Sequence, residues 1–348
     1  TEQAAVLYGL DTTNASQYWS NLPVSFVPRH GIALENLSTT SKAAAETLLN
    51  AALASQGQTT MAELRTADGY LGSLQSGYGK DLYYISFLGT PSATSPWVLQ
   101  FTGHHYTFHA SVSGDSQVSM TPNFVAVEPT KWTDNGVTHE PLATRRDAFL
   151  AMLNGLSSAE LTSAKLPQAY DDVLVGPQKD ATFPTTSEGL AVSGLTTAQK
   201  TLVKAAINRY AADGQTDQSA VYTSDAALSK TYISWASYAD LSTKGSYVRI
   251  DGPRVWIEFS VQSGIVIRDQ NHYHSIWRDK EKDYGGTLTF SPSTASTVPT
   301  GMTGTPPTLP TDMTGTPPTD MTGTPPALPT DTTTTSTTTE TTTSTATS

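Results

Sequence analysis

The last seventh of the chain limits what this sequence can fold into. The hexapeptide MTGTPP occurs three times between residues 302 and 326, and a run dominated by Thr and Ser fills residues 332–348. Such a sequence has too few large apolar side chains to offset the entropy that a chain loses on folding. We therefore expect a single globular domain over residues 1–296 and a disordered Thr/Pro-rich tail over residues 297–348.

The tail allows two interpretations. Pro- and Thr-rich stretches serve as exposed linkers, and they also serve as spacers, often O-glycosylated, that hold a domain away from a cell wall or membrane. The chain begins at Thr1 rather than Met and has N-x-S/T sequons at Asn14 and Asn36. From these features we expect a processed glycoprotein that is secreted or displayed at the cell surface, with the tail as a possible point of attachment.

Charge and cysteine content exclude several classes of function. Lys and Arg number 20 against 31 Asp and Glu, which gives a net charge of −11. An acidic chain without a basic run is a poor ligand for nucleic acid or anionic lipid. No apolar stretch approaches the roughly 18 residues of a transmembrane helix. The absence of cysteine excludes disulfides, thiolate metal ligands and cysteine nucleophiles.

The pattern of apolar residues predicts an α+β fold. Helices are expected over residues 39–55, 144–156 and 195–213, with shorter helical segments over 58–74 and 218–229. Strands are expected in two blocks on either side of the central helices: 81–87, 97–101, 106–112 and 118–127, then 231–236, 246–250, 255–261 and 272–277. The two blocks predict a mainly antiparallel sheet rather than an alternating parallel α/β arrangement.

The sequence lacks the short motifs of several large enzyme classes. It contains no G-x-S-x-G nucleophile elbow, no G-x-x-x-x-G-K-[ST] phosphate loop, no H-E-x-x-H zinc motif and no dinucleotide fingerprint. Serine hydrolase, kinase and nicotinamide chemistry therefore have no support in the sequence.

Histidines provide the main indication of chemistry. Five of the seven lie in two segments, FTGHHYTFHA and QNHYHSIWRD, and neutral imidazole is an effective ligand for Zn, Cu, Fe and Ni. On a strand, His272 and His274 share a face about 6.6 Å apart, a span that one ion can bridge, whereas His105 and His109 would lie about 13 Å apart. We therefore expect a metal site of His272 and His274 with His104 or His105, completed by a carboxylate or water.

Other interpretations of these histidines remain open. His272 and His274 are also consistent with a hydrogen-bonded structural pair, or with a catalytic or ligand-binding pair that needs no metal. His104 and His105 are also consistent with a turn that follows Gly103.

Three charged residues near the histidines are the catalytic candidates. Glu258 or Asp279 would serve as a general base for a metal-activated water, and Arg278 would orient a ligand carboxylate. Each also has a structural explanation, because charged residues after a strand often form a solvated loop. An inward-facing Glu258 would require a buried partner.

Four segments resemble a known family: WVLQFTGHH, TPNFVAVEP, YVRIDGPRVWIEFSVQ and NHYHSIWRDKEKDYGG. They are similar to the secreted proteins catalogued as domain of unknown function 3500, over roughly residues 30–290. The resemblance implies that the signature positions are Gly103, His104, His105, Glu128, Glu258, Gln262, Asn271, His272, His274, Trp277, Arg278, Asp279 and Asp283. His109 departs from the pattern, where Asn or another polar residue is expected. The family carries no established activity, so the resemblance favours the site and leaves the reaction open.

Two classes of function fit these observations. The first is a secreted metal-dependent enzyme, with hydrolysis favoured and Zn the preferred metal, while Cu in the same site would indicate oxidative chemistry. The alternative is an extracellular binding or structural module, or a device for metal capture, in which the histidines are structural or bind the ligand. In either case the expected partner is an extracellular small molecule, peptide or glycan.

Overall fold

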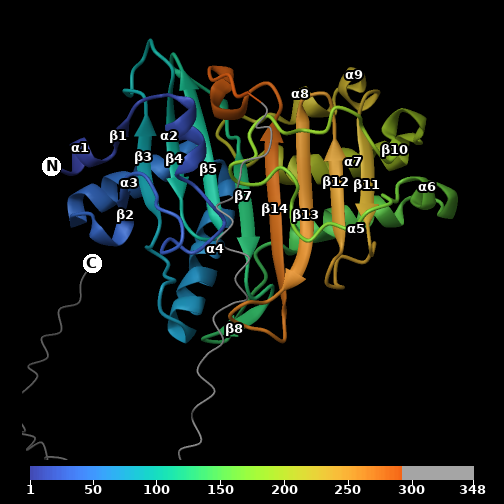
Figure 1. Cartoon of the computed structure of the whole chain (residues 1–348), viewed down its shortest axis with the longest axis horizontal. Coiled ribbons are helices and arrows are strands. Elements are labelled where there is room, and N and C mark those ends of the chain that lie inside the picture. Colours follow the sequence, from blue (N-terminus) through green and yellow to red (C-terminus); the bar gives the residue numbers. More distant parts are fainter. Residues whose placement is uncertain (292–348) are drawn as a thin grey trace, which may run out of the picture. The chain divides into compact units, whose positions relative to one another are not determined.

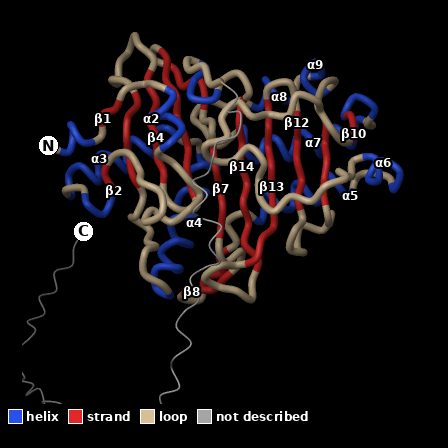
Figure 2. Tube along the Cα trace, viewed as in Figure 1, coloured by secondary structure: helices blue, strands red, loops and turns tan. Residues whose placement is uncertain are grey.

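The computed structural model describes residues 1–291, so the tail predicted over residues 297–348 lies outside the described part. The described chain forms one large sheet with helices packed against it, as the sequence predicts (Figures 1 and 2). The main path of the sheet runs β1-β3-β4-β5-β7-β14-β13-β12-β11-β10, with β2 added to β3 and β6 added to β5. Every pair in it is antiparallel except β1 with β3.

The strands match the two predicted blocks. The first block and its additions are β1 (Leu7–Tyr8), β2 (Ile32–Ala33), β3 (Tyr84–Leu88), β4 (Trp97–Thr102), β5 (Tyr106–Ser113), β6 (Ser116–Ser119) and β7 (Asn123–Val127). The second block is β10 (Leu190–Ala191), β11 (Tyr232–Ala236), β12 (Tyr247–Asp251), β13 (Val255–Ser263) and β14 (Asn271–Asp279). A separate hairpin pairs β8 (Trp132–Asp134) with β9 (Val137–His139). The strand predicted over 118–127 is divided, because β6 and β7 pair with different parts of β5.

The helices likewise lie close to their predicted positions. The longer ones are α3 (Thr39–Ala52), α4 (Ser55–Leu74), α5 (Ala143–Asn154) and α7 (Thr197–Ala211). Short ones are α1 (Glu2–Ala5), α2 (Thr12–Gln17), α6 (Ser158–Ser163), α8 (Ser219–Thr223), α9 (Asp225–Leu228) and the 3-10 turns η1 (Leu34–Asn36), η2 (Val192–Gly194) and η3 (Asp283–Gly286). Ser38 and Thr196 cap α3 and α7 by accepting the backbone N–H of the third helical residue. Within residues 1–291, every helix is too short or too polar to cross a bilayer.

The two faces of the sheet are covered differently. Helices α4, α5 and α7 lie behind the sheet in Figure 1, and irregular segments cross in front of it. The helix-covered face is apolar: Val125, Phe259 and Trp277 from the sheet join Phe149 and Ile207 from the helices in one buried cluster. Because side chains alternate along a strand, the neighbouring residues point to the other side, where two long irregular segments, residues 18–31 and 164–189, cover them.

The sheet is built from two copies of one unit. In each copy a short strand and a 3-10 turn lead into a capped helix, followed by four antiparallel strands: β3, β4, β5 and β7 in the first copy and β11 to β14 in the second. Residues 31–42 (GIALENLSTTSK) and 189–200 (GLAVSGLTTAQK) share Gly, Ala, Leu, Thr and Lys at matching positions, and Tyr-Ile-Ser recurs at 84–86 and 232–234.

The registers of the two copies correspond as well. Ile85 pairs with Phe101 as Ile233 pairs with Ile250, and the turns that follow, which begin at residues 103 and 252, close with the same backbone hydrogen bond. The copies meet where β7 pairs with β14.

Candidate metal centre

Three histidine side chains converge where the two copies meet. His105 lies in the turn between β4 and β5, and His272 and His274 lie at the start of β14 on the face away from the helices. The Nε2 atom of His272 is 3.0 Å from Nε2 of His105 and 3.0 Å from Nε2 of His274. The three ligand atoms all lie within 4.8 Å of one another, and the three residues are buried.

This spacing fits a single metal ion better than it fits hydrogen bonding. An ion held tetrahedrally at Zn–N distances of about 2.0–2.1 Å separates its nitrogens by roughly 3.3 Å. Without an ion, the single Nε2 of His272 would have to satisfy two neighbouring nitrogens at once, and a neutral ring nitrogen has only one proton or one lone pair to offer. Burial lowers the pKa of His105 and His272 well below the usual imidazole value, with the neighbouring histidines adding to the effect, so both rings are neutral at physiological pH.

The other ring nitrogen of His274, Nδ1, contacts two polar side chains. Its Nδ1 atom lies 2.9 Å from a carboxylate oxygen of Asp172, and the side-chain amide nitrogen of Gln262 is 3.0 Å away. A carboxylate that accepts from Nδ1–H fixes the tautomer with its lone pair on Nε2 and strengthens the imidazole as a ligand. Asp172 comes from the segment that crosses the front of the sheet, and its side chain is 40% exposed.

Carboxylates also stand behind the other two rings. Glu128 has an oxygen 3.9 Å from Nδ1 of His272, and Asp68 on α4 has one 4.0 Å from Nδ1 of His105. Both Nδ1 atoms are fully buried and lack a hydrogen-bond partner, so small movements toward these carboxylates would satisfy them. All three Nε2 lone pairs can therefore face one point while each Nδ1–H faces an acid.

His104 stands beside the three ligands rather than among them. Its ring stacks on that of His105, with centroids 3.4 Å apart and planes 25° from parallel, and its Nδ1 lies 3.1 Å from Asp68. His104, His105 and Asp68 are close enough to form a second group of ligand atoms. Imidazole binds a metal in the plane of its ring, however, so two stacked rings cannot both direct a lone pair at one ion.

Stacking of these two rings depends on the turn in which they lie. On a straight strand they would face opposite ways, but His104 and His105 lie in the bend that follows Gly103. A Cβ atom at Gly103 would lie 2.3 Å from the ring of Tyr83, so no other residue fits there. The hydroxyl of Tyr83 donates to Asp68 at 2.6 Å, and Arg29 donates to the carbonyl of Gly103 at 3.0 Å. The turn is thus fixed from both sides.

Glu258, predicted as a general base, lies two pairs along the sheet from His274, opposite Ile276. Its carboxylate is fully buried and accepts from the backbone N–H groups of Leu174 and Val175 and from the side chains of Tyr247 and Trp256. Burial raises its pKa, while these hydrogen bonds oppose the rise. The structure therefore gives Glu258 the buried partners that an inward carboxylate requires, and they fasten the crossing segment to the sheet.

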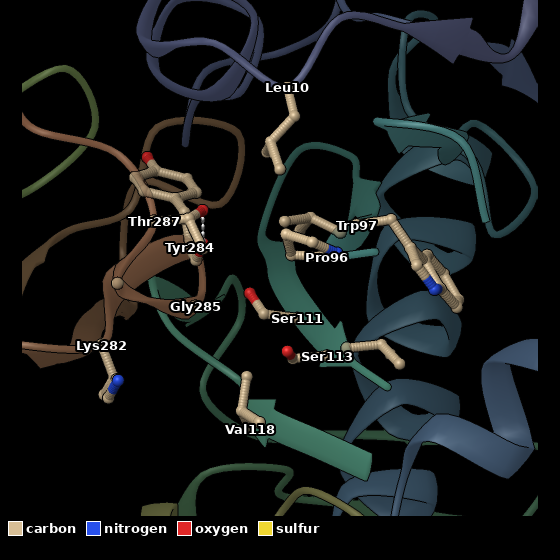
Figure 3. A pocket seen from close by; sticks show the side chains of 13 residues that line it. Leu10, Pro96, Trp97, Ser111, Ser113, Val118, Lys282, Tyr284, Gly285 and Thr287 are labelled. Carbon is tan, nitrogen blue, oxygen red and sulfur yellow. Dashed lines mark hydrogen bonds between the residues drawn. The ribbon is translucent and has the colours of Figure 1, made fainter. Parts of the chain in front are cut away.

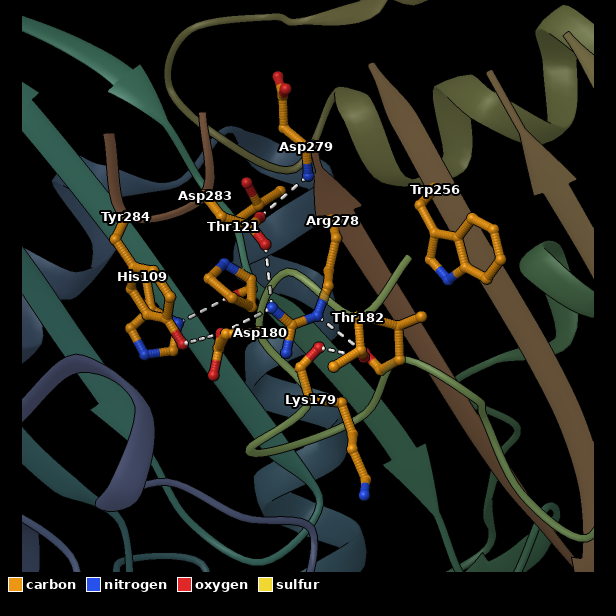
Figure 4. A network of polar contacts seen from close by, with 12 residues as sticks. His109, Thr121, Lys179, Asp180, Thr182, Trp256, Arg278, Asp279, Asp283 and Tyr284 are labelled. Carbon is orange, nitrogen blue, oxygen red and sulfur yellow. Dashed lines mark hydrogen bonds and ion pairs between the residues drawn. The ribbon is translucent and has the colours of Figure 1, made fainter. Parts of the chain in front are cut away.

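Arg278 and Asp279 lie at the opposite end of β14, about 13 Å and about 17 Å along the strand from His274, and they face opposite sides of the sheet. Arg278 donates to Asp180 and Asp283, each at 2.9 Å, and to two backbone carbonyls (Figure 4). Asp279 accepts from Tyr222 and Arg254 on the other side. The structure does not bring either residue to the three histidines.

His109 also lies outside the centre. It is buried on the same face as Arg278, with Nδ1 2.8 Å from the carbonyl of Pro122 and Nε2 3.0 Å from Gln100. Figure 4 shows its ring beside Tyr284, within the network around Arg278 and Asp180. Burial lowers its pKa to about 4.

The sequence predicted these three histidines among its four candidate ligands, with His104 as the alternative to His105, but it did not predict two of the carboxylates behind them. Asp68 lies on α4 and Asp172 lies in the irregular segment over residues 164–189. Neither residue belongs to a recognisable motif, and only the fold brings them close to the histidines. Glu128 was marked by the family resemblance alone, without a role.

A hollow of about 220 Å³ lies at the other end of β5 from His105, and the three converging histidines do not line it. Leu10, Pro96, Ser111 and Gly285 surround it (Figure 3). It includes none of the candidate site residues.

Comparison with known proteins assigns the family. The model described as "Protein of unknown function (DUF3500)" matches residues 1–286. No curated protein and no solved structure shows a significant match. Because the family model covers most of the chain, the protein belongs to this family.

Proposed function

We propose that the protein is a metal-dependent enzyme, most simply a hydrolase, with Zn²⁺ held by His105, His272 and His274. The observation that carries the proposal is the convergence of three Nε2 atoms, each on a ring whose other nitrogen faces a carboxylate. Three protein ligands and one open position are the arrangement of catalytic zinc, which lowers the pKa of a bound water to about 7 and polarises carbonyl groups.

The preference for zinc over copper rests on the chemistry that each metal would need, not on the ligand set. Neutral imidazole suits both metals, but hydrolysis with a closed-shell ion needs no electron donor. Copper in the same place would direct the proposal to oxidative chemistry. We further propose that the protein acts outside the cell, on a small molecule, peptide or glycan, a view supported by the Thr/Pro-rich composition of the tail.

A binding or structural module is the second candidate, and the burial of the site favours it. His105, His272 and His274 are 1%, 4% and 5% exposed. Structural ions are usually enclosed, with all positions filled by protein, whereas catalytic ions keep an exchangeable water. Water exchange at a bound paramagnetic ion such as Co²⁺ or Cu²⁺ therefore separates the two candidates.

Metal analysis tests the proposal. The full chain, purified without chelating resin, is expected to carry close to one equivalent of metal by mass spectrometry. The His272→Ala/His274→Ala variant is expected to lose it, while His139→Ala, which removes a histidine on β9 outside the centre, keeps it. If the wild-type protein carries no metal and binds none after addition of Zn, Cu, Fe or Mn, the proposed function is wrong.

The identity of the metal and a hydrolysis assay then address the reaction. Bound zinc, together with ester or peptide hydrolysis that stops when a chelator removes the metal, supports the hydrolase. Stoichiometric metal without an exchangeable water and without turnover supports the module.

A further inference from the structure

Large apolar side chains stand exposed on three loops beside the metal centre. They are Leu22 and Phe26 on one loop, Leu174 on a second and Ile265 on a third, which we call the apolar rim. Phe26 and Ile265 are 63% and 64% exposed, the highest values among the large apolar residues of the described chain. Exposed apolar side chains on several loops that are anchored at one site indicate a surface that binds a ligand.

The loop with Leu22 and Phe26 is tied directly to the centre. The neighbouring Asn21 places its amide nitrogen 3.5 Å from Nδ1 of His274. One guanidinium nitrogen of Arg29 donates to the carbonyl of Leu22 at 2.7 Å and to the carbonyl of Gly103 at 3.0 Å. Gly103 directly precedes the turn that contains His105. Leu22 therefore lies between the two strand regions that supply the ligands.

The other two loops are tied to carboxylates of the centre. Glu128, which stands behind His272, accepts from the backbone N–H groups of Val266 and Ile267, so Ile265 lies one residue from this anchor. Leu174 lies two residues from Asp172, the acid behind His274. Each loop of the rim is thus held by a residue that also contacts a proposed ligand or its partner.

The charge of the centre restricts the ligand further. Asp68, Glu128 and Asp172 bring three carboxylates to one cation, and an anionic ligand would approach this negative surrounding unfavourably. An uncharged carbonyl compound avoids that cost, and burial of its apolar part against the loops is favourable.

We propose that the apolar rim receives the apolar acyl or side-chain group of an uncharged ester or amide whose carbonyl reaches the metal. This inference rests on the proposed function, because it names the substrate class of the same site. Two parts of the site would recognise the substrate. The three histidines hold the ion that binds the carbonyl, and the apolar rim selects for the length of the apolar group.

The test uses hydroxamic acids as metal-binding probes, so that it needs no turnover. Acetohydroxamic and octanohydroxamic acid are titrated into the zinc-loaded full chain by calorimetry, and the eight-carbon probe is expected to bind at least about tenfold more tightly. In Phe26→Ser/Ile265→Ser the ratio is expected to fall toward one while the zinc content stays unchanged. Val221→Ser, which removes an exposed apolar residue on α8, is the matched control and should keep the ratio.

The other outcomes of the titration separate the rim from the metal centre. Equal affinities for the two probes in a protein that holds zinc overturn the rim and leave the metal centre standing, whereas failure to hold zinc removes the proposed function itself. If the double variant changes the oligomeric state by light scattering, or abolishes binding to neutral phosphatidylcholine vesicles, a second copy or a lipid surface covers the rim, and the substrate proposal is wrong.

Discussion

The two faces of the sheet in this protein are packed through different kinds of contact. The helix-covered face is held mainly by contacts between large apolar side chains, such as Phe149 and Phe259, whose ring centroids are 5.9 Å apart. The loop-covered face buries charged groups, among them Glu258 and Arg278, whose hydrogen bonds attach irregular chain to the strands. Apolar packing is non-directional, whereas buried charge demands defined partners. A face of the second kind fixes loops in place, and that is the face on which the histidines converge.

The largest expected effect compares one residue from each face. Arg278→Met leaves Asp180 and Asp283 buried without their partner, and is expected to cost about 3–5 kcal/mol of unfolding free energy. Ile257→Val, on the helix-covered side of the same sheet, is expected to cost about 0.5–1.5 kcal/mol. Urea unfolding of both variants measures the difference, and equal costs would contradict the distinction between the faces.

The next effect concerns pH. Burial lowers the pKa of His109 to about 4, whereas an unfolded histidine titrates near 6.5. As pH falls from about 6.5 to 4, the unfolded chain gains a proton that the folded protein does not, so the folded protein loses up to roughly 3 kcal/mol. His109→Gln is expected to lack this contribution. The gap between wild-type and variant unfolding free energies, from urea titrations between pH 4 and 7, should change across this window, and parallel curves would refute the role of His109.

The smallest effect separates metal binding from folding on the loop-covered face. Asp172→Asn removes the acid behind His274 and is expected to weaken zinc binding about 10–100-fold. Because the carboxylate is partly exposed, the unfolding free energy of the metal-free protein should change by less than about 0.5 kcal/mol. Competition with a zinc indicator measures the affinity. Asp171→Asn, one residue away and exposed, should leave it unchanged, and equal weakening in both variants would point to a general charge effect.

Much of the fold was predictable because its elements follow local rules. The Ala- and Leu-rich segment of α3 behind Ser38, and the alternating pattern of β13, fix helix and strand without reference to the rest of the chain. Pairing of His272 with His274 followed in the same way from the period of a strand.

What sequence reasoning could not supply depends on contacts between distant segments. The orientation of His104 and His105, which sequence alone left as alternatives, depends on a bend after Gly103, where the ring of Tyr83 leaves no room for a Cβ atom. Several structural partners of Glu258 and Arg278, among them Val175, lie in the irregular segment over residues 164–189, which has no periodic pattern to predict its path. The repeat of residues 31–42 at 189–200 was visible in the sequence, but the identities are few and the copies are far apart.

Because the two copies of the unit meet where β7 pairs with β14, we expect metal content to report whether both copies have folded and paired. One proposed ligand comes from the first copy of the unit and two from the second, and 167 positions separate His105 from His272. Contacts so remote along a chain close large loops and therefore form late in folding. A molecule in which either copy is misfolded owns at most two of the three ligands. We therefore expect an ion at this place to distinguish finished molecules from those that merely contain the right strands.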